Sequence, residues 1–267
     1  MQKLQLDIWS DIACPWCYIG KRHLEQALST FEHAADVEIH WHAFELDPSA
    51  PRIRDSSQTY AERISKKYGV STAQGQQMID RVIGTAEKSG LQFRYDVIKP
   101  GNTFDAHRLL HWAHGQGRQG ELKERLLRGY MTEGAAIGDP DVLVTLAAEA
   151  GLDATEARAI LDGDRYTAEV RSDERLAQEL GITGVPFFVM AGRIGVSGAQ
   201  PAEVLRDALA KAWTEHASAN PIKPEPTPKP PAPASPTATQ PPPKKPKPSM
   251  DIDEVDVSES LERKISA

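Results

Sequence analysis

Two short segments of the chain alternate apolar and polar residues, and a longer segment with a helical period lies between them. Residues 4–9 and residues 37–44 alternate, which is the pattern of a strand with one buried face. Between them, residues 15–31 carry apolar side chains at helical spacing. The chain is therefore predicted to begin as strand, loop, helix and strand, the start of an α/β unit.

The middle of the chain has helical periodicity almost throughout. Glycines separate the periodic segments, and Asp139-Pro140 gives a start signal, a cap residue followed by proline at the first helical position. We therefore expect a large all-helical insertion over about residues 58–180. Its predicted helices lie at residues 59–68, 72–89, 103–115, 120–133, 139–150, 154–162 and 167–180.

The strand pattern returns after this insertion. Residues 184–190 form a β-rich run, residues 191–193 fit a hairpin turn, and residues 194–196 fit a short return strand. A helix over residues 200–216 follows. The predicted order is βαβ, a helical block and then ββα, in an α/β protein without internal repeats.

The composition changes near residue 220. Thirteen of the chain's 20 prolines lie between residues 221 and 248, mixed with lysines, which predicts an extended linker over residues 219–249. The last segment, residues 250–267, is acidic and interspersed with apolar residues. It is either a docking motif that folds on a partner or a disordered tail, and its composition favours the tail. Residues 1–218 are then expected to form one domain.

Composition, net charge and cysteine content argue against some classes of function. The 267 residues are 40% hydrophobic, and the net charge of −7 does not favour nucleic-acid binding, which needs a basic face. No run approaches the roughly 20 apolar residues of a membrane helix, and the start lacks a signal-peptide pattern, so we expect a cytoplasmic protein without membrane contact. Thiols stay reduced there, so the chain's two cysteines are more typical of a catalytic or metal-binding pair than of a structural disulfide.

The two cysteines form the run Cys14-Pro15-Trp16-Cys17 after the first predicted strand. Pro15 suits the first turn of a helix, which places Cys14 at the helix N-terminus, where free N–H groups and the helix dipole stabilise a thiolate. Cys17 lies one turn further in and suits the role of the resolving thiol. Pro15 and Trp16 supply no cation, so we expect Cys14 to be less acidic than in sites with histidine between the cysteines.

A zinc site is the alternative for this cysteine pair. With no other cysteine in the chain, zinc would need two histidines, and His107, His111 and His114 share one face of a predicted helix. A cysteine pair that opens a helix beside a βαβ pattern is, however, typical of redox chemistry. We therefore favour catalysis and expect no metal and no bound cofactor.

Val185-Pro186 is the second candidate feature of the site. An X-Pro peptide bond can be cis at modest cost, and this one stands directly before a predicted strand. Taken with the cysteine pair and the ββα ending, we expect a cis bond at Pro186.

With these features together, the chain resembles the DsbA-like oxidoreductases of the FrnE type. The resemblance covers about residues 4–213 and implies a thioredoxin fold with a helical insertion. It implies Cys14 as nucleophile, Cys17 as resolving thiol and Pro186 as the cis proline facing them. In such a fold, substrate is expected to contact Pro15, Trp16 and Val185. The segments that carry the resemblance are residues 9–20, 102–108, 184–188 and 196–200.

Related families with the same fold offer an alternative activity. Hydroxychromene-carboxylate isomerases and kappa-class glutathione transferases resemble the chain in fold and use glutathione, usually with a single serine or cysteine at the active position. The intact cysteine pair argues against this alternative, although glutathione remains a candidate redox partner beside protein or small-molecule thiols and disulfides. Asn102, His107 and Arg108 are candidate substrate-binding residues; the competing interpretation is a helix cap and a packed helix face.

A non-enzymatic alternative is an adaptor that binds a partner through its proline-rich tail. Residues 244–248 and several other matches to PxxP are typical of ligands for SH3-like domains only in pattern, because such matches arise freely in proline-rich linkers.

Overall fold

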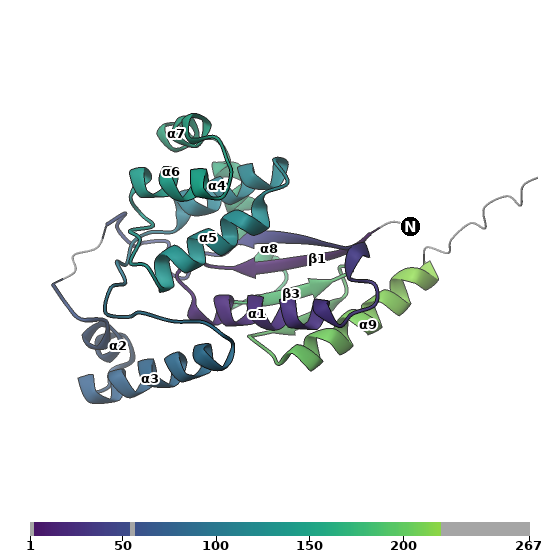
Figure 1. The fold of residues 1–267 in the computed structure, drawn as a ribbon, viewed down its shortest axis with the longest axis horizontal. Helices are drawn as coiled ribbons and strands as arrows, with labels where there is room; N and C mark the ends of the chain where they lie inside the picture. The colour runs from purple at the N-terminus through teal and green to yellow at the C-terminus, as the bar shows by residue number, and fades with distance from the viewer. Residues whose placement is uncertain (1–2, 54–56, 220–267) are drawn as a thin grey trace, which may run out of the picture. The chain divides into compact units, whose positions relative to one another are not determined.

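The computed structural model describes residues 3–53 and 57–219, so the predicted linker and acidic tip lie outside the described residues. The two alternating segments form strands β1 (Leu4–Ser10) and β2 (Val37–Ala43), which pair in parallel. Helix α1 (Pro15–Ser29) and a short 3₁₀ turn (Ala34–Asp36) connect them (Figure 1). This is the predicted βαβ opening.

The second half of the sheet comes from the end of the domain. Strand β3 (Phe187–Met190) pairs antiparallel with β1, and β4 (Ile194–Ser197) pairs antiparallel with β3. Within the described residues the sheet has four strands in the order β2-β1-β3-β4. β3 begins later than the predicted strand at residue 184, because Pro186 has no N–H to donate to a ladder. Helix α9 (Ala202–Ala219) follows.

The helical insertion between the two halves of the sheet is confirmed. Its helices begin and end within a few residues of the predicted bounds, as expected where the ends of helices fray. They are α2 (Tyr60–Tyr68), α3 (Thr72–Lys88), α4 (Phe104–Gly115), α5 (Gln119–Met131), α6 (Pro140–Glu149), α7 (Ala154–Asp162) and α8 (Thr167–Glu179).

Local sequence signals account for several helix starts. The Thr59 side chain and the Glu62 side chain form a reciprocal capping box at the start of α2, and Ser71 forms the same arrangement at α3. The predicted Asp139-Pro140 start is confirmed, with the Asp139 carboxylate accepting from the N–H of Asp141.

The two faces of the sheet are covered by different helices. Alternate residues of β1 point to opposite faces, so Ile8 packs against α1 and α9 whereas Trp9 packs towards Ala177 of α8. α1 and α9 lie side by side along one face (Figure 1). The core on that face includes Leu4, Leu6, Ile8, Leu24, Phe188, Met190, Leu205 and Leu209.

A larger hydrophobic core holds the helical insertion together. It is built mainly from α4, α5, α6 and α7, and it also takes in Ile12, Tyr18 and Ile19 from the segment around the cysteines. Leu24, further along α1, belongs to the core under the sheet. The cysteine segment therefore lies where the insertion and the sheet domain meet.

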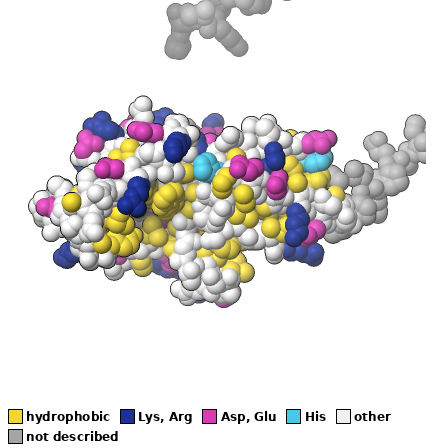
Figure 2. Space-filling model, turned by 90° about the horizontal axis from the view of Figure 1, so that it is seen from below, with side chains coloured by type: hydrophobic (Ala, Val, Ile, Leu, Met, Phe, Trp, Pro, Cys, Tyr) yellow, Lys and Arg dark blue, Asp and Glu magenta, His cyan; other side chains and the backbone are white. Residues whose placement is uncertain are grey.

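The face seen in Figure 2 carries Lys, Arg, Asp and Glu side chains interspersed with separate hydrophobic patches. No continuous area of one sign covers it. Within residues 3–53 and 57–219, none of the helices combines the length and the apolar character that spanning a membrane requires.

Candidate active site

Cys14 and Cys17 lie at the start of α1, directly beyond the end of β1. Cys14 is the N-cap residue with extended backbone angles (φ −91°, ψ 112°), and Pro15 occupies the first helical turn, as the sequence predicted. The N–H of Cys17 donates to the carbonyl of Cys14 at 3.1 Å. Both thiols are free; Cys14 is 4% exposed and Cys17 is fully buried. Cys14 is thus the less deeply buried of the two.

The loop before β3 faces the first cysteine. The Cys14 thiol donates to the carbonyl oxygen of Val185 at 3.5 Å, and the Val185–Pro186 peptide bond is cis. Helix α1 approaches this loop at Gly20, where an added Cβ would lie 2.9 Å from Cγ of Pro186. Glycine is thus what allows the helix and the proline to pack this closely.

The residues between the cysteines form the rim of the site. Pro15 is half-buried, and the Trp16 side chain is 42% exposed. An exposed tryptophan beside a reactive thiol offers apolar contact area to a substrate. Leu46, another exposed apolar side chain, follows β2.

A cavity of about 680 Å³ lies close to the cysteines, and Ala13, the residue before Cys14, is one of its lining residues. Tyr60 of α2 and Tyr130 of α5 contribute to its lining. Burial raises the pKa of Tyr60 to about 12, and the nearby charge of Cys14 adds to the increase. The sequence patterns gave no sign of these tyrosines, because they are brought to Cys14 only by the packing of the insertion.

Asp11 is a buried carboxylate beneath the cysteine loop. Its Oδ2 accepts from the N–H of Leu46 at 2.8 Å, and its Oδ1 lies 3.4 Å from Nε2 of His107. Burial opposes its ionisation, but these hydrogen bonds and the His107 ring lower the pKa of Asp11 overall. His107 is likewise buried, and burial lowers its pKa despite the Asp11 carboxylate. His107 therefore supports the loop from below.

The other two candidate substrate-binding residues have structural partners. Asn102 caps α4 by accepting from the N–H of Phe104 at 2.8 Å, and its amide donates to Glu45 at 3.1 Å. Arg108 is buried and donates to Asp105 and to carbonyl oxygens at the end of α7, among them that of Gly163 at 2.6 Å. This geometry matches the competing interpretation of a cap and a packed face. The structure does not bring the Arg108 guanidinium to the cysteines.

The histidines that could complete a zinc site are not arranged around the two thiols. His111 Nε2 lies 2.9 Å from a carboxylate oxygen of Asp173, and the His114 ring packs edge-on against His40 at 4.7 Å between ring centres. Across residues 3–53 and 57–219, no group of three or more His, Cys, Asp or Glu side chains has a metal-binding arrangement. The structure thus gives the zinc alternative no ligand set.

Lys123 of α5 is a buried charge behind the site. It is fully buried and its ammonium interacts electrostatically with Cys17 and Asp11. One feature of the sequence pointed to a buried lysine here: Lys123 stands among the apolar residues of α5, which include the buried Leu122 and Leu126. A pattern of this kind is also compatible with a lysine that reaches solvent, so it did not identify the residue.

The two thiols ionise as a coupled pair. Burial opposes a charge on Cys17, but the hydrogen bond from the Cys14 thiol and the positive charge of Lys123 outweigh it and lower the pKa of Cys17. The hydrogen bond to Cys17, followed by burial, raises the pKa of Cys14 well above its ordinary value. One proton of the pair is thus lost more readily than the second. The helix N-terminus beside Cys14 and the Lys123 charge near Cys17 both favour a thiolate within the pair.

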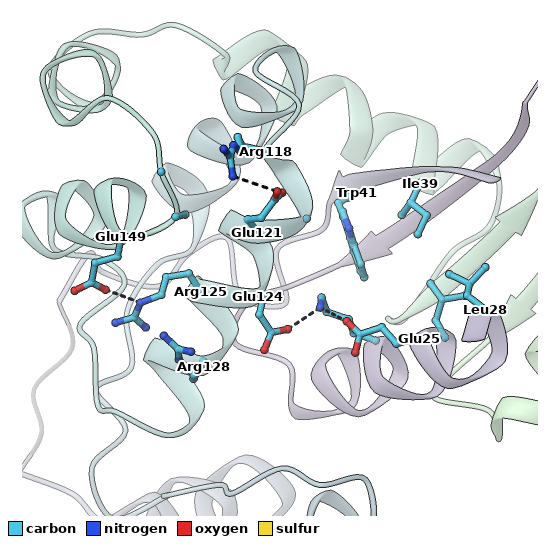
Figure 3. Close-up of a pocket in the computed structure, with 15 residues that line it drawn as sticks. Glu25, Leu28, Ile39, Trp41, Arg118, Glu121, Glu124, Arg125, Arg128 and Glu149 are labelled. Carbon is cyan, nitrogen blue, oxygen red and sulfur yellow. Dashed lines mark hydrogen bonds and ion pairs between the residues drawn. The ribbon is translucent and has the colours of Figure 1, made fainter. Parts of the chain in front are cut away.

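A second cavity, of about 710 Å³, lies between α1, β2, α5 and α6 (Figure 3). Leu28, Ile39 and Trp41 form its apolar wall. The charged side chains on its rim pair with one another, for example Arg125 with Glu149 at 2.5 Å. The cysteines are not among its lining residues.

Known proteins resemble the chain both in sequence and in fold. An uncharacterized protein of Bacillus subtilis (strain 168), YwbO, is 29% identical over 209 residues, which cover 77% of this chain and 96% of that protein. The crystal structure of a probable DsbA oxidoreductase from Streptomyces coelicolor is 46% identical, with a TM-score of 0.74, and the match covers 79% of this chain and 91% of that one.

Two more distant structures share the fold alone. The cytosolic disulfide reductase DsbM from Pseudomonas aeruginosa is 20% identical with a TM-score of 0.54, covering 80% of this chain and 99% of that one. A 2-hydroxychromene-2-carboxylate isomerase is 14% identical with a TM-score of 0.56, covering 80% and 98%. A model of the DSBA-like thioredoxin domain matches residues 5–210, from β1 into α9. The chain belongs to the family of proteins with a DSBA-like thioredoxin domain.

Proposed function

We propose that the protein is a thiol–disulfide oxidoreductase in which Cys14 is the nucleophile and Cys17 the resolving thiol. The Cys14 thiolate attacks one sulfur of a substrate disulfide and releases the other as a thiolate. Cys17 then gives up its proton to water and attacks Cys14 Sγ. The Cys14–Cys17 disulfide forms, and the second substrate thiolate is released. Two electrons pass to the substrate, and each released thiolate takes up a proton from water. The reverse sequence oxidises a dithiol.

The observation that carries this proposal is the different placement of the two thiols at the start of helix α1. Cys14 lies at the helix N-cap with its thiol against the Val185 carbonyl, whereas Cys17 is fully buried one turn behind it. Because the two sulfurs interact closely, the proton can pass from Cys14 to Cys17 as a substrate approaches, which leaves the thiolate on the sulfur at the helix N-cap.

We propose that substrate binds along the rim formed by Pro15, Trp16 and Val185. The Val185 carbonyl, which accepts from the Cys14 thiol in the free protein, is available to a substrate N–H once Cys14 has reacted. Trp16 supplies an exposed apolar surface next to the sulfur. His107 contributes from below through Asp11, and Pro186 packs behind Val185 against Gly20.

We propose a cytoplasmic location and soluble thiols or disulfides as partners. The cytosolic reductase DsbM has this fold, and one of its structures contains glutathione, which supports low-molecular-weight thiols as candidate redox partners. We also infer that residues 1–218 form the catalytic domain and that the proline-rich segment and the acidic tip stand outside it.

The test of this function compares wild type with Cys14→Ser and Cys17→Ser in two assays, insulin disulfide reduction and glutathione conjugation or isomerisation. The proposal predicts that both variants lose insulin reduction by at least about 10³-fold, because each step needs its own sulfur. Full insulin reduction by Cys17→Ser would refute the mechanism. Glutathione conjugation retained by Cys17→Ser, with insulin reduction weak even in wild type, would instead support a glutathione-dependent isomerase or transferase.

A further inference from the structure

Lys123 is a buried cation without a hydrogen-bond partner. Its side chain is fully buried, and no described residue accepts a hydrogen bond from Nζ. Nζ lies 5.4 Å from the centre of the Trp41 ring, over its face. A cation–π contact offsets only part of the cost of burying an ammonium, so this arrangement needs another source of stabilisation.

The position of Lys123 is fixed from both sides of α5. One turn earlier, the Gln119 side chain exchanges two hydrogen bonds with the backbone of Trp41, at 3.0 and 2.9 Å. The next residue, Glu124, accepts from Tyr18 at 2.7 Å and from Lys21 at 2.6 Å, both on α1. Figure 3 shows Trp41 on β2 and Glu124 on α5. Lys123 is thereby held between the strand and the helix that carries Cys17.

The charges around Lys123 come from the elements packed against it. Those that favour its protonated form lie on the cysteine loop and on α1, and two basic groups oppose it. Burial is the larger effect and lowers the pKa of Lys123 to about 8. The ionisable groups that interact with it are Asp11, Cys14, Cys17, Lys21 and His107.

We propose that Lys123 is a positioning residue that holds negative charge on the buried Cys17 sulfur and so drives the resolving step. This inference rests on the proposed function. Cys17 enters that step as a thiolate beside the Lys123 ammonium and attacks Cys14 Sγ in the mixed disulfide. The Cys14–Cys17 bond forms, the bond from Cys14 to the substrate sulfur breaks, and the electron pair leaves with the substrate thiolate. A buried cation thus replaces the water that would solvate an exposed thiolate.

The proposal also explains why an unpaired charge is tolerated here. A buried ammonium without a partner destabilises the fold, and replacing it by an apolar side chain of similar length should not reduce stability. A lysine with a purely structural role would behave in the opposite way. Measuring both the Cys17 titration and the stability of a Lys123 variant therefore distinguishes a role in ionising Cys17 from a purely structural role.

The experiment titrates the thiolate absorbance near 240 nm in the reduced protein and in Cys14→Ser, each with and without Lys123→Met. In the Cys14→Ser background we expect Lys123→Met to reduce the Cys17 thiolate fraction at neutral pH about tenfold. Stopped-flow decay of a preformed mixed disulfide on Cys14 should slow several-fold, while the melting temperature stays equal or rises. Lys88→Met, which removes an exposed lysine of α3, should change neither the titration nor the decay.

Two further variants keep the test decisive. Lys123→Gln is a second neutral replacement if Lys123→Met does not fold, and Lys123→Arg should restore the low Cys17 pKa because it keeps the charge. An unchanged Cys17 titration in the neutral variants, or a fall in melting temperature without a change in titration, overturns the inference. In either case insulin reduction that still requires both cysteines would leave the proposed function standing.

Discussion

Each sulfur of the dithiol has a distinct set of neighbours. The Cys14 thiol meets the Val185 carbonyl and the helix N-terminus, whereas Cys17 is enclosed with the charge of Lys123 nearby. In the proposed mechanism Cys14 attacks the substrate, and Cys17, with the buried charge nearby, carries out the second step.

The contact between Gly20 and Pro186 yields a prediction at this scale. An alanine Cβ at residue 20 would lie 2.9 Å from the Pro186 ring, so Gly20→Ala should force α1 and the Val185 loop apart. We expect it to lower the free energy of unfolding by about 1–3 kcal/mol and to slow insulin reduction.

Gly84→Ala is the matched control for that variant. Gly84 also lies within a helix, α3, but an added Cβ there meets nothing within 4 Å. Alanine should raise stability at this position by about 0.5–1 kcal/mol through its higher helix propensity. Denaturant unfolding of both variants measures the difference, and equal stability of the two would contradict the close packing at Gly20.

The sequence could identify Cys14, Cys17 and Pro186 because each stands in a short local pattern. Tyr60 and Lys123 could not be found in this way, because they reach the site only through the packing of α2 and α5. Asn102 and Arg108 remain candidate substrate-binding residues from the family resemblance. In the structure they hydrogen-bond to Glu45 and to the end of α7, contacts that only the packing of the insertion brings about.

At the scale of elements, His42 links β2 to α8. Its ring lies 2.8 Å from Asp173 of α8 and 2.9 Å from Asp7 of β1, and it stacks on Trp9 at 4.5 Å. Burial disfavours the charged ring, but the hydrogen bonds and charges of Asp173 and Asp7 raise the pKa of His42 to about 9. The imidazolium is therefore the folded-state form at neutral pH.

This raised pKa predicts a loss of stability in alkaline solution. Because the folded pKa exceeds the ordinary histidine value, the stabilisation is complete below about pH 6.5 and is lost as the pH rises through about 9. The free energy of unfolding should fall by on the order of 2–3 kcal/mol between these limits. His42→Gln should remove that pH dependence, and an identical slope in the variant would exclude His42 as its source.

The order of strands and helices could be predicted from the sequence. The spacing of apolar residues changes from every second residue, as in strands, to 3.6 residues, as in helices, and back again along the chain. Element bounds were less accurate where tertiary contacts decide them. Helix α9 continues to Ala219, beyond the predicted end at residue 216, and β3 starts at Phe187 rather than at residue 184. Helix caps such as Thr59 and Asp139 are local, so the starts that they specify matched better.

At the scale of the whole molecule, the candidate catalytic residues all lie before residue 219. The family match ends at residue 210, and α9 ends at Ala219. A chain ending at residue 219 is therefore expected to keep the melting temperature of the full chain. Its rate of insulin reduction should stay within about twofold of that of the full chain. Loss of a captured partner with unchanged redox activity would point to an adaptor role for the tail, and loss of redox activity would contradict the proposed domain boundary.

The fold alone does not decide between disulfide exchange and glutathione-dependent chemistry, since structures of both kinds share it. The distinction lies in whether the second sulfur takes part. In the proposed function Cys17, which is buried behind Cys14 with the charge of Lys123 nearby, resolves the mixed disulfide.

Mass spectrometry of the Cys17→Ser variant after exposure to a peptide disulfide tests this claim most directly. The account predicts a stable mixed disulfide between the peptide and Cys14, because no resolving sulfur remains, and no adduct in Cys14→Ser. Release of the peptide from Cys17→Ser at the wild-type rate, or an adduct on Cys17 in Cys14→Ser, would contradict it.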